Sequence, residues 1–179
     1  MKKVVVMSDN HGDQEAIELI KEYEADADYF IHLGDSCSFD DRVLEGCIAI
    51  RGNNDWPLDH LPYKATIKIE GINILMAHGH QYGYYNREES MMYDLEEHEC
   101  TVLLYGHTHA PVIDHIGDYY FINPGSTSLP RSAFGPSYAI LTINGSHLDA
   151  EIVKFVRDEE EDEDSDDDSW FDIFKDLFF

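Results

Sequence analysis

The sequence is poor in cysteine and has no long apolar run. Among its 179 residues there are three cysteines, Cys37, Cys47 and Cys100, an odd number at wide spacing, so no disulfide framework is expected. No stretch reaches the length of a transmembrane helix, and residues 1–3 lead directly into a strand-like run rather than a signal peptide. These absences favour a cytoplasmic protein without a membrane partner.

Basic residues are also scarce. There are 12 Lys and Arg against 37 Asp and Glu, a formal net charge of -25, and residues 1–156 alone carry -15. Non-specific nucleic-acid binding needs basic patches, so no nucleic-acid partner is expected. A body this acidic and poor in lysine is similar to proteins of high-salt cytoplasm, where ions screen the self-repulsion, so we expect a halophilic protein.

A change in composition divides the chain into a domain, 1–156, and an acidic tail, 157–179. Residues 158–168 are almost all carboxylates and are expected to be disordered. Residues 170–179 have apolar side chains at helical spacing, but an isolated helix this short is marginal in water. We expect this apolar segment to dock on its own chain, on a sister subunit of a homo-oligomer, or in a groove of another protein.

Apolar periodicity predicts an α/β fold. Lys2–Met7 and Tyr29–Leu33 have the pattern of buried strands, and Asp13–Glu24 between them has that of a helix with Asp13 as N-cap, which predicts a βαβ unit. The second half is strand-rich, so we expect two sheets face to face with helices outside. Further elements are expected at Ile48–Ile50, Ala65–Glu70, Asn73–Ala77, Arg87–Glu97 (a helix), Thr101–Tyr105, Val112–Ile116, Tyr119–Ile122, Ser137–Ile143 and His147–Val156, with turns at Gly71, Gly117-Asp118 and Asn144-Gly145.

Five times an apolar run ends in Asp, Asn or His, usually beside glycine. In α/β sheets, ligands bind in the crevice outside the carboxyl ends of the strands. Polar side chains that converge there predict a metal site. The five segments are Asp9-Asn10-His11, Gly34-Asp35, Gly52-Asn53-Asn54-Asp55, His78-Gly79-His80 and Gly106-His107-Thr108-His109.

The candidate ligands are carboxylates, imidazoles and one amide, which suit hard-to-borderline divalent ions. Seven ligands with only two carboxylates suit two ions that share a bridging carboxylate. Two such ions, roughly 3.5–4 Å apart, clamp a phosphate and lower the pKa of a bridging water. An anionic phosphate is therefore the expected substrate. The candidate ligands are Asp9, His11, Asp35, Asn53, His78, His107 and His109.

Taken in order, the five motifs resemble those of the calcineurin-like metallophosphoesterases, most closely the small YfcE-like phosphodiesterase branch, over about residues 3–155. The resemblance implies a four-layer αββα sandwich of two mixed β-sheets and a binuclear site. Manganese is the expected metal, with nickel, iron, zinc or cobalt as alternatives. Carried over by position, Asp9, His11 and His109 hold the first ion, Asn53, His78 and His107 hold the second, and Asp35 bridges them.

Position 54 departs from the phosphoprotein phosphatases of that superfamily. These have a histidine after the motif asparagine, thought to assist the leaving group, whereas Asn54 has no acid character. We therefore expect activity on phosphodiesters with aryl or nucleotide leaving groups. Asn54, Asp55 and His80 are the candidate catalytic residues. Asp55 would orient a neighbouring group or cap a helix, and His80 would support a ligand, contact phosphate or serve local structure.

The leading hypothesis is a binuclear metal-dependent phosphodiesterase that hydrolyses small phosphodiesters by in-line attack of a metal-bridging hydroxide. A phosphomonoesterase is the first alternative, and Asn54 counts against it. The second is a non-catalytic scaffold like the retromer subunit of the same fold. Intact ligand positions count against that alternative. A nuclease is a third option, which the negative charge disfavours.

Overall fold

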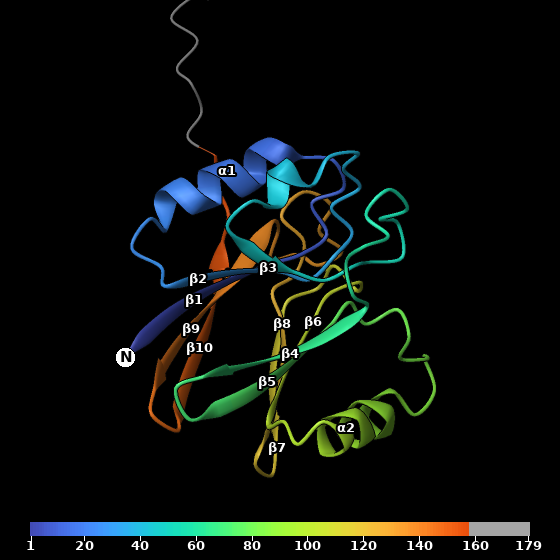
Figure 1. The fold of residues 1–179 in the computed structure, drawn as a ribbon, viewed down its shortest axis with the longest axis vertical. Helices are drawn as coiled ribbons and strands as arrows, with labels where there is room; N and C mark the ends of the chain where they lie inside the picture. The colour runs from blue at the N-terminus through green and yellow to red at the C-terminus, as the bar shows by residue number, and fades with distance from the viewer. Residues whose placement is uncertain (158–179) are drawn as a thin grey trace, which may run out of the picture.

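Two five-stranded β-sheets lie face to face in the computed structural model, which describes residues 1–157 (Figure 1). The first sheet has the order β10-β9-β1-β2-β3, and the second has the order β4-β5-β6-β8-β7. The strands of the first sheet are β1 (Lys2–Met7), β2 (Tyr29–His32), β3 (Cys47–Ala49), β9 (Ser137–Asn144) and β10 (His147–Lys154). Those of the second are β4 (Lys64–Ile69), β5 (Ile72–Ala77), β6 (Val102–Tyr105), β7 (Val112–Ile116) and β8 (Tyr119–Asn123).

The first strands and helix form the predicted βαβ unit. Helix α1 (Gln14–Tyr23) starts after Asp13, whose side chain accepts a hydrogen bond from the backbone of Ala16, as an N-cap does. It connects β1 to β2, which pair in parallel, and β2 pairs in parallel with β3. The other helices are α2 (Arg87–Glu97) and the short 3-10 helix η1 (Asp41–Leu44).

Three hairpins connect the antiparallel pairs β4–β5, β7–β8 and β9–β10. Two-residue loops join them, at residues 70–71, 117–118 and 145–146. The last turn was predicted one residue too early, because Asn144 still pairs with His147 in the ladder. The turn is therefore Gly145-Ser146, with Gly145 at a φ of 61°, a conformation that favours glycine.

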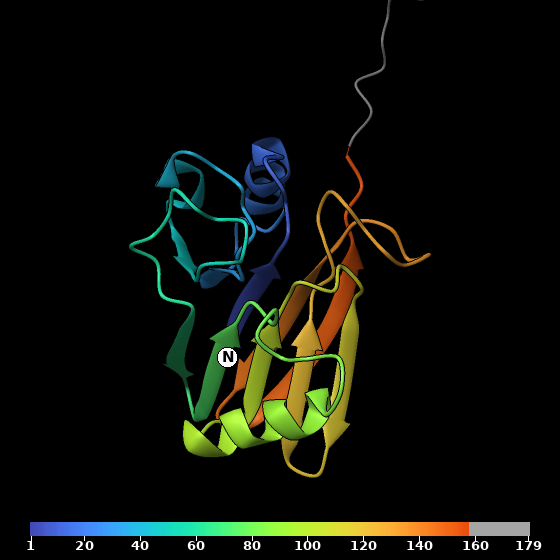
Figure 2. The ribbon, with the colours of Figure 1, turned by 90° about the vertical axis from the view of Figure 1, so that its right-hand side faces the viewer.

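The two faces of each sheet bury different cores. Val4 and Val6 of β1 face the second sheet and pack in one cluster with residues such as Ile74 and Leu104. Val5 and Met7 point the other way, toward α1. On the second sheet, Met91 and Leu95 of α2 cover Leu75 and Leu103, and Figure 2 shows α2 lying across these strands. This confirms the predicted αββα sandwich of two mixed sheets.

The predicted tail, 157–179, lies outside the described residues except for Arg157. Arg157 forms ion pairs with Asp13 and Glu15 at the start of α1. The domain boundary, the disorder of 158–168 and the docking of 170–179 stay predictions. Within the described part of the chain, no helix is long and apolar enough to cross a membrane.

The fully buried His32 at the end of β2 makes stability depend on pH. Its Nδ1 accepts from Gly34 N at 3.2 Å, so its Nε2 donates to Asn10 Oδ1 at 3.0 Å, and burial lowers the pKa of this neutral imidazole to about 4. The unfolded chain binds a proton near its ordinary pKa, so His32 costs stability as the pH falls from about 6.5 toward 4. The loss at pH 5 is about 2 kcal/mol.

We predict that His32→Gln reduces the drop in unfolding free energy between pH 7 and pH 5 by about 2 kcal/mol. Urea denaturation of both proteins with a chelator present measures this without a contribution from metal binding. An identical pH dependence in the two proteins would contradict the assignment, even if the variant is less stable at pH 7.

Candidate metal centre

Both sheets bring the ends of parallel strands to one end of the molecule. Asp9, Asp35 and Asn53 follow β1, β2 and β3 of the first sheet, and His78 and His107 follow β5 and β6 of the second. In Figure 2 the arrows of β1, β5 and β6 point toward this same end. Ligands that are distant in the sequence therefore meet between the edges of the two sheets.

Most of the ligand-bearing turns adopt a left-handed backbone. Among non-glycine residues this conformation costs roughly 1–2 kcal/mol each, least for Asp, Asn and His. Such strain is typical of functional sites that the surrounding structure holds in place. The φ angles are 56° for Asp9, 44° for His11, 54° for Asp35, 68° for His107 and 58° for His109.

Glycines allow these turns to approach one another. A Cβ on Gly106 would lie 2.0 Å from Ser8 Oγ, and one on Gly52 would lie 2.2 Å from Asp35 Oδ1. Any side chain at these positions would push the loops apart. The glycines next to the ligand motifs thus serve close backbone packing rather than chemistry.

The first group of ligand atoms comes from Asp9, His11 and His109. His11 Nε2 and His109 Nε2 lie 3.1 Å apart, and His109 Nε2 lies 3.3 Å from Asp9 Oδ1. Bonds of about 2.1 Å from one ion to these atoms correspond to ligand separations of about 3.0 Å in octahedral and about 3.4 Å in tetrahedral geometry. These two separations fit one shared ion, whereas the third, between His11 Nε2 and Asp9 Oδ1, is wider at 3.9 Å.

The second group comes from Asp35, His78 and His107. Asp35 Oδ2 lies 3.3 Å from His78 Nε2 of this group and 3.9 Å from His11 Nε2 of the first. The Asp35 carboxylate thus lies between the groups, and Asp9 Oδ1 does so as well, 3.8 Å from His78 Nε2. That Asp35 bridges two ions stays a prediction. Asn53, on the neighbouring loop, has a buried Oδ1.

Buried polar atoms without a partner mark the same place. Among the described residues, Asp9 Oδ1, Asn53 Oδ1 and His78 Nε2 are buried and accept or donate no hydrogen bond. Such atoms cost free energy unless something compensates them, and a divalent cation does so for lone pairs of oxygen and nitrogen. The residues present therefore fit divalent metal ions.

Outer contacts orient the imidazoles. His78 Nδ1 donates to the carbonyl of Leu33 at 2.7 Å, and His109 Nδ1 donates to that of Leu129 at 2.6 Å. Each bond leaves Nε2 with a free lone pair toward the centre, as metal-binding histidines require. His11 Nδ1 lies 3.3 Å from the sulfur of Cys37.

The ionisation of the site suits metal binding. Burial raises the pKa of Asp9 and of Asp35, but their imidazole neighbours outweigh it and keep both carboxylates ionised. Burial lowers the pKa of His11 and of His107, which favours the neutral ligand form. Burial lowers the pKa of His78, but the Asp35 and Asp9 carboxylates outweigh it and raise this pKa above its usual value.

The three predicted catalytic residues have different positions. Asn54 is exposed, and its backbone N and Nδ2 donate to the two oxygens of Asp35 at 2.8 and 2.6 Å. His80 lies beside the second group, with its ring 5.5 Å from that of His78 and 6.2 Å from that of His107.

Asp55 is buried and accepts four hydrogen bonds. The donors are the backbone amides of Asp35, Gly52 and Cys37, at 2.7–2.8 Å, and the hydroxyl of Ser36 at 3.0 Å. Asp55 therefore ties the loops after β2 and β3 together and orients Asp35, as one of its expected roles required. This geometry makes it a positioning residue rather than a group that touches substrate.

Several supporting residues were missed from the sequence. Cys37 has a signal, because it lies two residues after Asp35 of the Gly-Asp motif, and burial raises the pKa of its thiol to about 11. The loop after β8 also supports the site, because Ser126 Oγ donates to the carbonyl of Asp9 at 2.7 Å and Asn123 Nδ2 donates to that of Gly106 at 2.8 Å. Leu33 and Leu129, whose backbone carbonyls orient His78 and His109, could not be recognised from the sequence.

Comparison with known proteins shows the family of this chain. The profile of the calcineurin-like phosphoesterase superfamily domain matches residues 1–146. The chain is 35% identical over 155 residues to a probable metallophosphoesterase, YsnB, of Bacillus subtilis, which covers 85% of this chain and 89% of that protein. It is 30% identical over 168 residues to the phosphodiesterase YfcE of Escherichia coli, with 79% and 88% covered. A crystal structure of a predicted phosphoesterase from Streptococcus pneumoniae TIGR4 has a TM-score of 0.78 at 29% identity, with 86% and 89% covered. This chain therefore belongs to the calcineurin-like phosphoesterase superfamily, and its relatives support a place in the YfcE-like branch.

Proposed function

We propose that the protein is a binuclear metal-dependent phosphodiesterase acting on small phosphodiesters. The observation that carries the proposal is the position of Asp35 between two groups of ligand atoms, each compact enough for one ion. When bound, the two ions would polarise the phosphate and lower the pKa of a water that attacks phosphorus in line. The relative named phosphodiesterase YfcE supports the same reaction class.

The residues of this chain would position the reacting groups. Asn54 holds both oxygens of Asp35, and Asp55 holds the backbone of the same residue, so the shared ligand is fixed from two sides. His80 lies on the second group's side, where it can contact a phosphate oxygen. Preorganised polar groups of this kind lower the barrier because they do not need to reorganise during reaction.

Asn54 favours a phosphodiester over a phosphomonoester as the substrate. The amide of Asn54 cannot protonate a leaving group, so the substrate must carry a group that leaves without an acid. Aryl and nucleotide groups meet this requirement. Exposed aromatic side chains on the ligand-bearing loops, Phe39 and Trp56, are 92% and 78% exposed and offer surfaces for such groups.

The alternative of a non-catalytic scaffold predicts degraded ligands. Here the two carboxylates and four imidazoles converge, with outer hydrogen bonds intact on His78 and His109.

We retain manganese as the proposed metal, because imidazole and carboxylate ligands suit it, and the cytoplasm as the proposed location.

The proposal predicts metal-dependent turnover. After removal of metal by a chelator, the protein should not hydrolyse bis(p-nitrophenyl) phosphate, and Mn²⁺ should restore turnover. Asp35→Asn should lower kcat by at least about 100-fold, because even changes to the partners of metal ligands cost 10–100-fold. Turnover that survives chelation would contradict metal dependence, and full activity of Asp35→Asn would contradict the bridging role.

A third ligand-like group provides a matched control. Asp94, Glu97 and His98 cluster on α2, but Asp94 already accepts from Lys64 and from Tyr82, both at 2.5 Å. His98→Ala should therefore leave turnover and metal stoichiometry unchanged. Calorimetric titration with Mn²⁺ should count two ions per wild-type chain and fewer in Asp35→Asn.

Position 54 provides a test of substrate class. Asn54→His should raise the ratio of phosphomonoester to phosphodiester turnover at least about tenfold, since a positioned general acid is typically worth 10²–10⁴-fold. Asn54→Ala is the control, because it removes the bond to Asp35 Oδ2 without adding an acid. If Asn54→His leaves monoester turnover unchanged, the assignment of this position is wrong.

The acidic body predicts a need for salt. Residues 1–156 carry a net charge of -15, and the screening length falls from about 10 Å at 0.1 M salt to about 3 Å at 1 M. We propose a halophilic protein whose thermal midpoint rises with KCl between 0.1 and 2 M. Equal stability and activity in dilute buffer would contradict this.

A further inference from the structure

Arg51, beside the candidate metal centre, has no acidic partner among the residues that the structure describes. Five of the eleven described Lys and Arg side chains pair with a carboxylate, namely Lys2, Lys3, Arg42, Lys64 and Arg157. Among the described residues, no carboxylate oxygen lies within 4.0 Å of the Arg51 guanidinium. A cation that pairs with no described carboxylate and lies next to an anion site is available to bind an anion.

The guanidinium of Arg51 is fixed in place. Its Nε donates to the carbonyl of Asp55 at 3.1 Å, and its Cζ lies 5.1 Å from the centre of the Tyr63 ring. Its backbone amide donates to the carbonyl of Pro62 at 2.8 Å. Since a guanidinium has five N–H donors and Nε uses one, the Nη donors have no hydrogen-bond partner in the described part of the chain.

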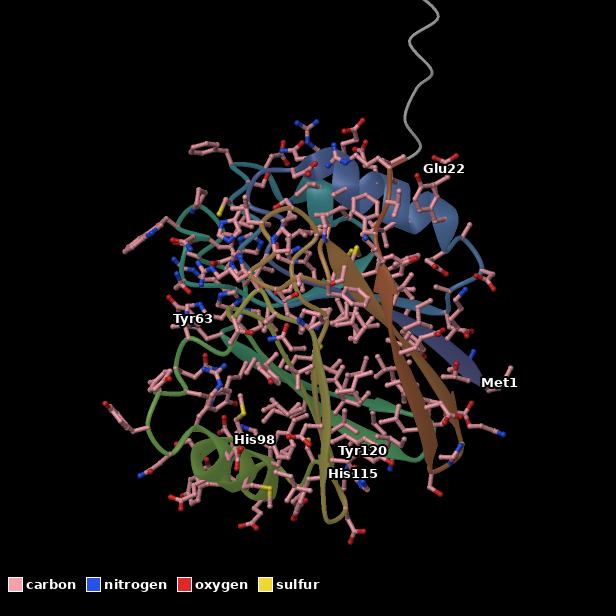
Figure 3. The ribbon with its side chains drawn as sticks, turned by 180° about the vertical axis from the view of Figure 1, so that it is seen from behind. Met1, Glu22, Tyr63, His98, His115 and Tyr120 are labelled. Atoms are coloured by element: carbon pink, nitrogen blue, oxygen red, sulfur yellow. The ribbon has the colours of Figure 1, made fainter. Side chains whose placement is uncertain are left out.

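A row of rings connects this arginine to the metal centre. The ring of Tyr63 lies 5.9 Å from that of His80, which in turn lies 6.2 Å from that of the ligand His107. Tyr63 is 51% exposed, and Figure 3 shows it nearer the end of the ligand loops than His115 and Tyr120 at the opposite end. Arg51 and Tyr63 thus form a shelf on the side of the second ligand group.

We propose that the Arg51–Tyr63 shelf is a subsite for a second phosphate of the substrate. The preferred substrates are then nucleotide-like phosphodiesters that carry another phosphate on the same organic group. A guanidinium matches phosphate in a bidentate fork, and one already held by Tyr63 and Asp55 loses little freedom on binding. This inference rests on the proposed function, because it assigns the group that the diester would carry.

A purely structural role for Arg51 makes a different prediction. Its bonds to Asp55 and Pro62 also hold the loop between β3 and β4. If that were its only role, its removal would weaken the binding of every ligand equally. A subsite instead makes the loss specific for ligands with the second phosphate.

Equilibrium binding to the Mn²⁺-loaded full chain tests the subsite without turnover. Calorimetry should show that thymidine 3′,5′-bisphosphate binds roughly tenfold or more tightly than thymidine 5′-phosphate, the range of one charge-assisted contact. Arg51→Met, which keeps the unbranched stem of the side chain but removes the guanidinium, should bring this ratio close to one. Arg51→Lys should retain part of it, and Arg42→Met, on the exposed η1, should retain all of it.

Kinetics separate the subsite from the proposed function. The p-nitrophenyl ester of thymidine 5′-phosphate should have a lower KM with a 3′-phosphate than without, and Arg51→Met should abolish that difference. Equal wild-type affinities for the two nucleotides, or a preference that survives in Arg51→Met, would overturn the subsite. A binding preference lost in Arg51→Met, without hydrolysis of either ester, would support the subsite and refute the diesterase.

Discussion

The two sheets are joined at one end by hydrogen bonds between ligand loops, and the whole site depends on them. His107 N donates to the Asp9 carboxylate at 2.9 Å, and the His78 imidazole donates to the carbonyl of Leu33 at 2.7 Å. Each bond connects a strand end of one sheet to a strand end of the other. They hold left-handed turns that would otherwise relax, and Gly106 makes the approach sterically feasible.

Buried charges and unpaired polar atoms at this same end of the molecule destabilise the fold. Asp9 and Asp35 are buried carboxylates, and neighbouring imidazoles compensate them only in part, since buried atoms such as Asp9 Oδ1 and His78 Nε2 have no hydrogen-bond partner in the described chain. Divalent ions would neutralise these charges and satisfy these atoms. Metal binding and stability of the loops are therefore linked, as in other proteins whose ligands are assembled only by folding.

Because residues 1–156 are so acidic, positive groups at the candidate metal centre would also be needed to attract an anionic substrate. An anionic substrate meets repulsion from a body of net charge -15, so attraction must come from local positive groups. Metal ions at the candidate centre would be one such source, and Arg51, held against Tyr63, is the other that our proposal uses. Discrimination between anions would then depend on where their charges lie relative to these two groups.

Much of the fold and of the candidate ligand set could be predicted from the sequence itself. Burial periodicity and caps are local, so the βαβ unit, the limits of α2 and the polar strand ends could be predicted from neighbouring residues. The five motifs similarly indicated the candidate ligands. The tertiary structure alone decided how these residues interact: Asp35 between the groups, Asn54 holding it, Asp55 tying two loops, and Arg51 against Tyr63. These contacts join residues from different loops, and their geometry depends on how the sheets pack, which no local pattern encodes.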